Sequence, residues 1–209
     1  MKRIWDISPP VDEHAAVFPG DTRYSQRLHF ALDANCPVNV HAITLSPHTG
    51  AHADAPMHYA AGALAIGAVD LHPYLGTCRV IHCIGSVGLV DLADVQHALE
   101  SGAALPQRVV FRTRQVATQS WESFAALAPE LLAYLASKNV ALVGIDTPSV
   151  DPATSQTLDA HKTLLHHNLR VLENLVLDDV PEGDYELIAL PLKLMHADAS
   201  PVRAILREL

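Results

Sequence analysis

The sequence has few cysteines and no cysteine motif. Its 209 residues include only Cys36, Cys78 and Cys83, and no two of them form a Cys-x-x-Cys pair. Three thiols cannot all pair within one chain, so this is not the disulfide framework of a small secreted protein. We therefore expect free thiols in a reducing compartment.

Basic clusters and long apolar runs are also absent. The formal net charge is −9, and a phosphate-rich partner would require grouped Lys and Arg, so neither nucleic acid nor an anionic membrane is expected to bind. The most apolar stretch, 59–71, is short and broken by glycines, and Asp6 with two prolines interrupts the start where a signal peptide needs an apolar segment. These absences favour a cytoplasmic protein with a small substrate that is not strongly anionic, although a bound metal could reverse the local field.

The composition predicts one globular domain over residues 1–209. Apolar residues make up 49% and charged residues 18%, enough for a hydrophobic core, and no repeat or linker divides the chain. The first half is β-rich and punctuated by proline, whereas helices and strands alternate in the second half, so we expect an α/β or α+β fold with a mixed sheet. The strands are expected at 38–45, 78–84, 109–111, 140–145, 169–173, 185–190 and 202–206.

Turn and capping residues define three expected helices. Asp91 can cap a helix over 92–100 that stops at Gly102. Pro129 suits the first turn of a helix over 129–137, after which Asn139 fits a left-handed position. A third helix opens at His161 and ends at Asn168. The order of the strands does not follow from these patterns.

Histidine is unusually frequent, with thirteen residues, and three lie close together with an aspartate: His48, His52, Asp54 and His58. All four positions are even, so an extended chain would point their side chains to one side. A straight strand would still separate the first two histidines by roughly 13 Å, too far for one ion. Gly50 permits a positive φ and a tight turn that brings them together, and the prolines on either side argue against a helix.

Imidazole and carboxylate together suit Zn²⁺ and, less tightly, Mn²⁺ or Fe²⁺. The two oxygens of Asp54 would allow that residue to bridge two ions. The alternative is a polar loop whose histidines merely form hydrogen bonds with their neighbours. Further ligands would come from elsewhere in the fold, and His161 and Glu173 are the candidates. An unpaired Glu173 would be costly to bury in its apolar surroundings; metal coordination, an exposed strand face or an ion pair with Arg170 would each explain it.

These residues resemble the metal-dependent cyclase superfamily and, within it, the bacterial kynurenine formamidases (arylformamidases). The likeness extends over nearly the whole chain. Its motifs are His-Thr-Gly-Ala-His-Ala-Asp-Ala-Pro-Met-His at 48–58, Phe-Pro-Gly-Asp at 18–21, Gly-Ile-Asp-Thr-Pro-Ser-Val-Asp-Pro at 144–152, His-Lys at 161–162, Leu-Glu-Asn at 172–174, Leu-Pro-Leu-Lys at 190–193 and Asp-Ala-Ser-Pro-Val-Arg at 198–203. The resemblance implies a compact, barrel-like mixed sheet flanked by helices, the swivelling β/β/α fold of cyclases, and a homodimer.

The resemblance also implies a site with two zinc ions, for which Mn²⁺ is a possible substitute. One ion would be bound by His48, His52 and Asp54, with Asp54 reaching the second. His161 would bind the second ion and Glu173 would serve both. His58 would stay unligated as the acid and base, and Phe18, which on sequence alone could equally belong to the core, would contact the aromatic substrate.

The implied reaction is hydrolysis of N-formyl-L-kynurenine to L-kynurenine and formate in tryptophan degradation, by water that the ions activate. A serine hydrolase could cleave the same bond, but the chain has no Gly-x-Ser-x-Gly elbow. A relative that opens a cyclic amide such as isatin, with Mn²⁺, is an alternative with the same site. A non-catalytic zinc-binding protein is a third, less favoured because structural zinc sites are closed and often rich in cysteine.

Overall fold

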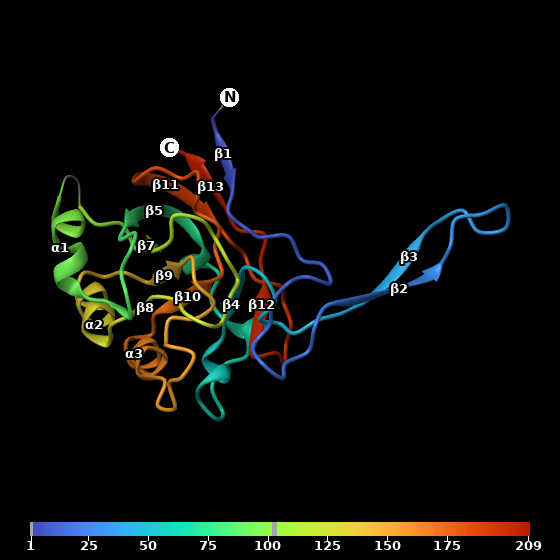
Figure 1. Ribbon diagram of the computed structural model, residues 1–209, viewed down its shortest axis with the longest axis horizontal. Coiled ribbons are helices and arrows are strands. Elements are labelled where there is room, and N and C mark those ends of the chain that lie inside the picture. Colours follow the sequence, from blue (N-terminus) through green and yellow to red (C-terminus); the bar gives the residue numbers. More distant parts are fainter. Residues whose placement is uncertain (1, 102–103) are drawn as a thin grey trace.

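The computed structural model describes residues 2–101 and 104–209, which form a curled mixed sheet with helices on one side (Figure 1). Within these residues nine strands make the main sheet, in the order β1-β13-β11-β5-β7-β9-β10-β4-β12. Their bounds are β1 Ile4–Asp6, β4 His52–Asp54, β5 Leu75–His82, β7 Arg108–Arg112, β9 Leu142–Ile145, β10 Arg170–Glu173, β11 Gly183–Ile188, β12 Ala199–Pro201 and β13 Ile205–Glu208. Two small sheets pair β2 Ser25–Phe30 with β3 Val40–Thr44, and β6 Leu89–Val90 with β8 Ala126–Leu127.

The centre of the main sheet is parallel and its two flanks are antiparallel. β5, β7, β9 and β10 run in parallel, and β7, β9 and β10 are buried along their whole length, as expected for strands covered on both faces. β11, β13 and β1 continue the sheet on one side, and β4 and β12 continue it on the other. The apolar runs at 109–111 and 140–145 thus predicted strands correctly.

The three expected helices are present in the described part of the chain. α1 (Leu92–Glu100) has a capping box between Asp91 and Asp94, while its expected stop at Gly102 lies outside the described residues. α2 (Pro129–Ser137) begins at its proline and is followed by Asn139 at φ 64°. α3 (Asp159–His167) begins two residues earlier than predicted and is followed by Asn168 at φ 55°. Short 3₁₀ turns occupy Pro56–His58, Ile66–Ala68 and His72–Tyr74.

The core has two parts, one on each face of the sheet. On the helical face, Leu99 of α1, Leu131 of α2 and Leu164 of α3 pack over Phe111 and Ile145. On the other face the curled sheet closes around side chains from both flanks and from the 3₁₀ turns, among them Ile7, Ala53, Ile66, Tyr74, Leu187 and Leu206. This curled sheet with helices outside it confirms the expected barrel-like α+β fold.

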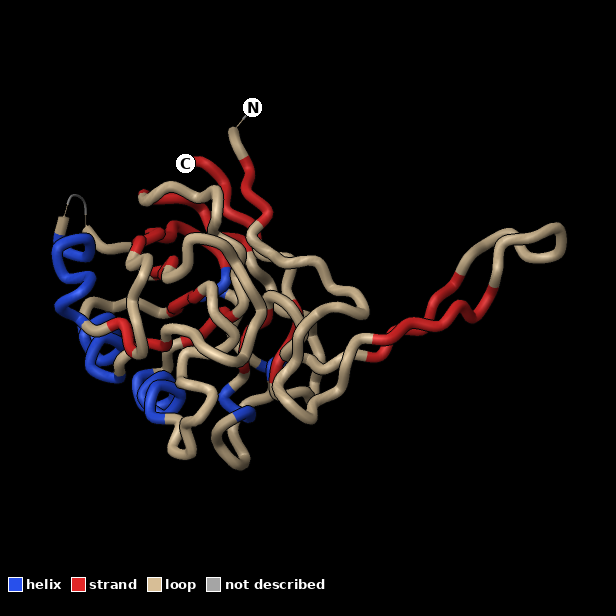
Figure 2. Tube along the Cα trace, in the orientation of Figure 1, coloured by secondary structure: helices blue, strands red, loops and turns tan. Residues whose placement is uncertain are grey.

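A two-stranded arm, residues 23–44 around β2 and β3, projects from this body (Figure 2). The strand expected at 38–45 is real, but its alternation does not mark a buried face, because every residue of both strands is exposed. The strand expected at 202–206 is partly wrong, since the chain links β12 to β13 there and pairing resumes only at Ile205.

Two other expectations concern cysteines and membranes. Cys36, Cys78 and Cys83 are free thiols, and the latter two are buried. Among the described residues, none of the helices has the length and apolar character that crossing a bilayer requires.

Candidate metal centre

Strand β4 brings the histidine run to the second half of the chain. It lies between β10 and β12, with His52 opposite Glu173 and Asp54 opposite both Val171 and Ala199. His52 and Asp54 are two residues apart and share one face of the strand, so His52 Nε2 lies 3.5 Å from Asp54 Oδ1. The predicted alternation of side chains holds within β4, although β4 comprises only residues 52–54 of the eleven at 48–58.

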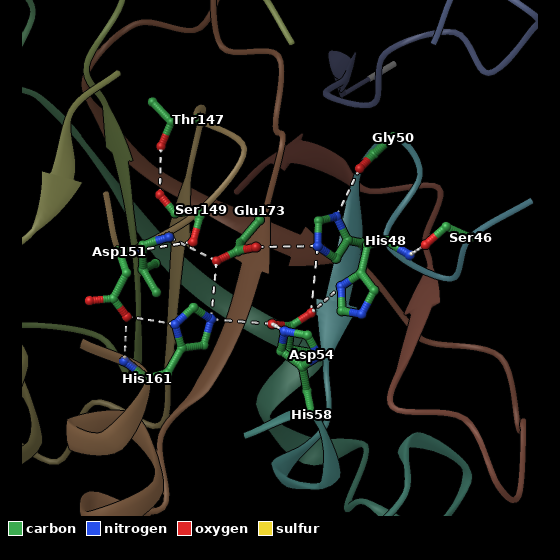
Figure 3. A network of polar contacts seen from close by, with 12 residues as sticks. Ser46, His48, Gly50, Asp54, His58, Thr147, Ser149, Asp151, His161 and Glu173 are labelled. Atoms are coloured by element: carbon green, nitrogen blue, oxygen red, sulfur yellow. Dashed lines mark hydrogen bonds and ion pairs between the residues drawn. The ribbon is translucent and has the colours of Figure 1, made fainter. Parts of the chain in front are cut away.

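Gly50 makes the turn that the spacing required. Its φ is 68°, and a Cβ there would lie 2.7 Å from Val11 Cγ2. The turn carries His48 back beside the strand, so the rings of His48 and His52 are 5.0 Å apart and His48 Nδ1 lies 3.0 Å from Asp54 Oδ1. His58 follows from the 3₁₀ turn, with its ring 4.3 Å from that of His48. All four residues therefore converge, and three of them, His48, Asp54 and His58, are labelled in Figure 3.

The two candidates from the second half join the same cluster. His161, on the first turn of α3, has its Nε2 3.4 Å from Asp54 Oδ2 and 3.7 Å from Glu173 Oε1. Glu173 Oε2 lies 3.2 Å from His52 Nε2, and its other oxygen accepts a hydrogen bond from the Val150 amide. Glu173 is buried, so the exposed-face interpretation is wrong. Arg170 instead donates to Asn168 and to the Leu169 carbonyl.

Each histidine of the cluster has one ring nitrogen facing inward and another with an outer partner. The outer Nδ1 of His52 lies 2.9 Å from the Gly50 carbonyl. His161 Nδ1 lies 2.7 Å from Asp151 Oδ2. His48 Nε2 and His58 Nδ1 each lie 3.2 Å from Asp198 Oδ2. If the outer nitrogens carry the protons, every inner nitrogen presents a lone pair to the centre, the arrangement of metal-binding histidines.

The centre has the donor set of a cation site. Both oxygens of Asp54 and Nε2 of His161 are buried without a hydrogen-bond partner, an expensive condition unless a cation is present. Two groups of donor atoms lie within 4.8 Å of one another, His48 with Asp54 and His58, and His52 with Asp54 and Glu173. Asp54 belongs to both groups, so the residues fit a pair of divalent ions that share this carboxylate.

The electrostatics of the centre favour positive charge. Burial would raise the pKa of Asp54, but the imidazoles of His161, His48 and His52 hold that pKa well below its usual range. Burial also lowers the pKa of His48, yet Asp54 and Asp198 raise it to about 9. Against the same burial effect, Asp151, Asp54 and Glu173 raise the pKa of His161 to about 10. The carboxylates thus attract cations into a buried position, whether protons or metal.

A cavity of about 300 Å³ opens beside these groups. His48, His52, His58, His161 and Glu173 line one part of it, and Phe18, Trp121, Pro148 and Leu158 line another. The Phe18 and Trp121 rings meet edge to face with centroids 5.1 Å apart. Phe18 is 49% exposed, so the interpretation as a core residue is wrong, and it forms part of an aromatic wall within reach of the donor atoms.

Sequence reasoning missed Trp121, Asp151 and Asp198. Asp151 follows the strand β9 and accepts hydrogen bonds from the Ala160 and His161 amides, so it caps α3 from a distance as well as holding the His161 ring. The Val-Asp-Pro sequence at 150–152, shortly before the helix, was the available signal for it. Trp121 stands in an irregular segment with no spacing to mark it, and Asp198 begins the resembling motif at 198–203, for which the resemblance implied no site role.

Comparison with known proteins agrees with this geometry. A family model described as "Putative cyclase" matches residues 5–152. A solved "predicted metal-dependent hydrolase from Bacillus stearothermophilus" superposes with a TM-score of 0.82 at 27% identity, covering 100% of both chains. Isatin hydrolase A from Labrenzia aggregata has a TM-score of 0.83 at 22% identity, covering 99% of this chain and 93% of its own, a likeness of fold alone. The chain belongs to the cyclase family.

Curated relatives narrow this assignment. A kynurenine formamidase from Polaromonas naphthalenivorans is 72% identical over 207 residues, which cover 99% of this chain and 92% of the relative. The kynurenine formamidase from Bordetella pertussis is 61% identical, with 100% of both chains covered. Within the cyclases, the chain is therefore a member of the kynurenine formamidase family.

Proposed function

We propose that this protein hydrolyses N-formyl-L-kynurenine to L-kynurenine and formate with the help of two Zn²⁺ ions. The observation that carries the proposal is the position of Asp54, buried without hydrogen-bond partners between two groups of inward-facing donors and beside an aromatic-walled cavity. The identity to kynurenine formamidases over the whole chain supports the choice of substrate.

The chain supplies ligands for two ions. His48, His52 and Asp54 would hold one, Asp54 and His161 would hold the other, and Glu173 would serve both. Divalent cations bound there supply a lowered pKa for water and polarisation of the formyl oxygen. Asp151 and the Gly50 carbonyl keep the rings of His161 and His52 in place by accepting their outer N–H groups.

His58 handles the protons of the reaction. The departing aniline nitrogen is a poor leaving group until it is protonated, and an imidazole can first accept and then deliver that proton. The His58 side chain is 33% exposed, and its Nε2 lies 4.0 Å from Asp54 Oδ2. It is therefore close to the buried centre and retains access to solvent for proton exchange.

Phe18 and Trp121 hold the aromatic ring of the substrate. Their edge-to-face pair forms a wall of the cavity, and a planar aryl formamide can pack against it while its formyl group reaches the donor atoms. A wall of this kind also keeps bulk water away from the substrate ring.

Metal analysis with one assay tests the proposal. We expect about two zinc ions per chain, hydrolysis of formylkynurenine that stops on chelation, and recovery when Zn²⁺ is returned. The same assay is run in parallel on protein reloaded with Mn²⁺ in place of Zn²⁺. Faster turnover of isatin than of formylkynurenine would assign the site to cyclic amides, and inactivity toward both with zinc tightly bound would favour a non-catalytic zinc protein.

We also propose a homodimer formed through the arm. Six large apolar side chains of the arm are at least 40% exposed: Leu28, Phe30, Leu32, Val38, Val40 and Ile43. An isolated two-stranded ribbon is only marginally stable in water, so these side chains need a surface to cover them. Residues 23–44 contain two arginines and one aspartate, so the arm has a formal charge of +1. Since the whole chain has a formal charge of −9, the remaining residues have a charge of −10. A second copy offers the complementary acidic body.

Sedimentation tests the dimer. Replacing Leu28 and Ile43 with lysine puts charge on the arm, and the double variant is expected to sediment as a monomer while the unaltered protein sediments as a dimer. Asn35→Lys in the connection between the two strands is the matched control and should remain dimeric. A double variant that stays dimeric would place the interface elsewhere.

A further inference from the structure

Asp198 is held firmly at the edge of the cluster. It directly precedes β12, and its carbonyl accepts a hydrogen bond from the Ala55 amide at 2.8 Å. The preceding carbonyl, of Ala197, accepts from the Ile66 amide at 2.9 Å. These bonds attach the backbone at Asp198 to Ala55, immediately after β4, and to the 3₁₀ turn that begins at Ile66, so the backbone that carries the Asp198 carboxylate is held in place. Asp198 does not line the cavity.

One oxygen of this carboxylate contacts two different histidines. Asp198 Oδ2 lies 3.2 Å from His48 Nε2 and 3.2 Å from His58 Nδ1. His48 is a proposed ligand and His58 is the proposed acid and base, and their rings are 4.3 Å apart. The shared oxygen thus lies on the outer side of both rings, opposite the nitrogens that face Asp54.

Among the described residues, Asp198 provides the hydrogen-bonding contact of the His58 ring. The other groups near the ring are Asp54 Oδ2 at 4.0 Å and the rings of His48, Tyr59 and His161 at 4.3, 6.1 and 5.9 Å. No hydrogen bond joins the His58 ring to any of these groups. Within the described part of the chain, Asp198 is therefore the group that fixes which nitrogen of His58 carries the proton and which way the ring turns.

We propose that Asp198 is a positioning residue that sets the tautomers of His48 and His58 together, an inference that rests on the function proposed above. By accepting the Nε2–H of His48, it leaves Nδ1 free to bind metal. By accepting the Nδ1–H of His58, it leaves Nε2 free to exchange a proton at the reacting centre. A single carboxylate therefore links metal binding to proton transfer.

The test compares Asp198→Ala with Asp179→Ala, the control. Asp179 is exposed, and its backbone carbonyl accepts from Trp5. In the zinc-loaded protein, ¹⁵N NMR of the imidazoles should show His58 as the Nδ1–H tautomer. Asp198→Ala should shift it toward the Nε2–H form that prevails for free histidine. Zinc affinity should fall by roughly 10–100-fold and kcat by about as much, with KM within about twofold because Asp198 is outside the cavity.

Asp198→Asn keeps the shape of the side chain without its charge and serves if the alanine variant does not fold. We expect its kcat to fall by roughly 10-fold. An unchanged His58 tautomer in Asp198→Ala, or a kcat for either Asp198 variant equal to that of Asp179→Ala, would overturn the inference. The tautomer and the zinc affinity need no substrate, so they report on Asp198 even if formylkynurenine is not the substrate.

Discussion

The four histidines of the centre form two pairs that differ in burial and in outer partner. In the inner pair, His52 and His161, the side chains are 1% and 3% exposed, and each ring has its own acceptor, the Gly50 carbonyl or Asp151. In the outer pair, His48 and His58, the side chains are 19% and 33% exposed, and one oxygen of Asp198 serves both. Each oxygen of Asp54 lies near one histidine of each pair, Oδ1 near His48 and His52 and Oδ2 near His58 and His161.

The difference in burial between the two pairs matches two requirements of the proposed hydrolysis, cation binding and proton transfer. The proposed ligands His52 and His161 are buried and have individual acceptors, whereas His48, also a proposed ligand, is 19% exposed and shares its acceptor with His58. A residue that moves protons must exchange them with solvent, which a partly exposed ring permits. Since Asp54 lies near both pairs, it connects the shielded histidines to the accessible ones.

Asp54→Asn should have the largest effect, because it removes the feature common to both pairs. The substitution keeps the shape of the side chain but not its charge. Losing several kcal/mol of cation-dependent stabilisation lowers kcat/KM by about 10⁴-fold or more. Steady-state assays with metal analysis check this, and near-normal turnover with full metal content would contradict the central role of Asp54.

His58→Ala comes next and tests the outer pair. The variant should keep about two zinc ions per chain while kcat falls by roughly 10²–10⁴-fold, the usual contribution of a general acid and base. Metal content and turnover are measured on the same sample. Because His58 lies in one of the two donor groups, loss of one zinc ion would instead make it a ligand.

Asp151→Asn tests the inner pair. The single amide oxygen can still accept a hydrogen bond from the start of α3, but the charge facing His161 and one of the two acceptor oxygens are lost. Zinc affinity should fall by roughly 10–100-fold, and turnover at saturating zinc should recover most of its original value. If titration against a chelator gave an unchanged affinity, Asp151 would be no more than a helix cap.

Gly50→Ala should have the smallest effect. The positive φ and the contact with Val11 cost about 1–3 kcal/mol of folding stability, visible as a lower Tm. Gly85→Ala is the control, since Gly85 also has a positive φ of 90° but no atom within 4 Å of a built Cβ. Equal losses in both variants would show that φ alone, not the close packing of the turn, determines the cost.

Local signals in the sequence located the helices and the central strands. Asp91, Pro129, Asn139 and Asn168 mark helix ends by effects that act within one turn, and the structure has them where expected. The same reasoning did not predict that the arm is exposed. Alternation along residues 38–45 indicates a strand but does not show whether the same chain covers either face of it.

The proposed ligands were recoverable because they lie close in sequence or have a role that the resemblance implies, whereas Asp151 and Asp198 lie in resembling motifs without such a role. Spacing alone indicated the cluster at 48–58, and the turn at Gly50 followed from geometry. The outer partners did not follow, because Asp198 is 140 residues from His58 and its contact depends on β12 pairing with β4. The order of the strands, which brings Asp198 beside His58, could not be derived from the sequence.

The insertion of β4 between β10 and β12 has a consequence for the order of folding. Residues 52–54 pair with strands that begin at residues 170 and 199, so each pairing closes a long loop of chain. Contacts that close long loops form late because the entropy of loop closure must be overcome first. We therefore expect the local contacts of the helical face to form before the histidines and carboxylates converge.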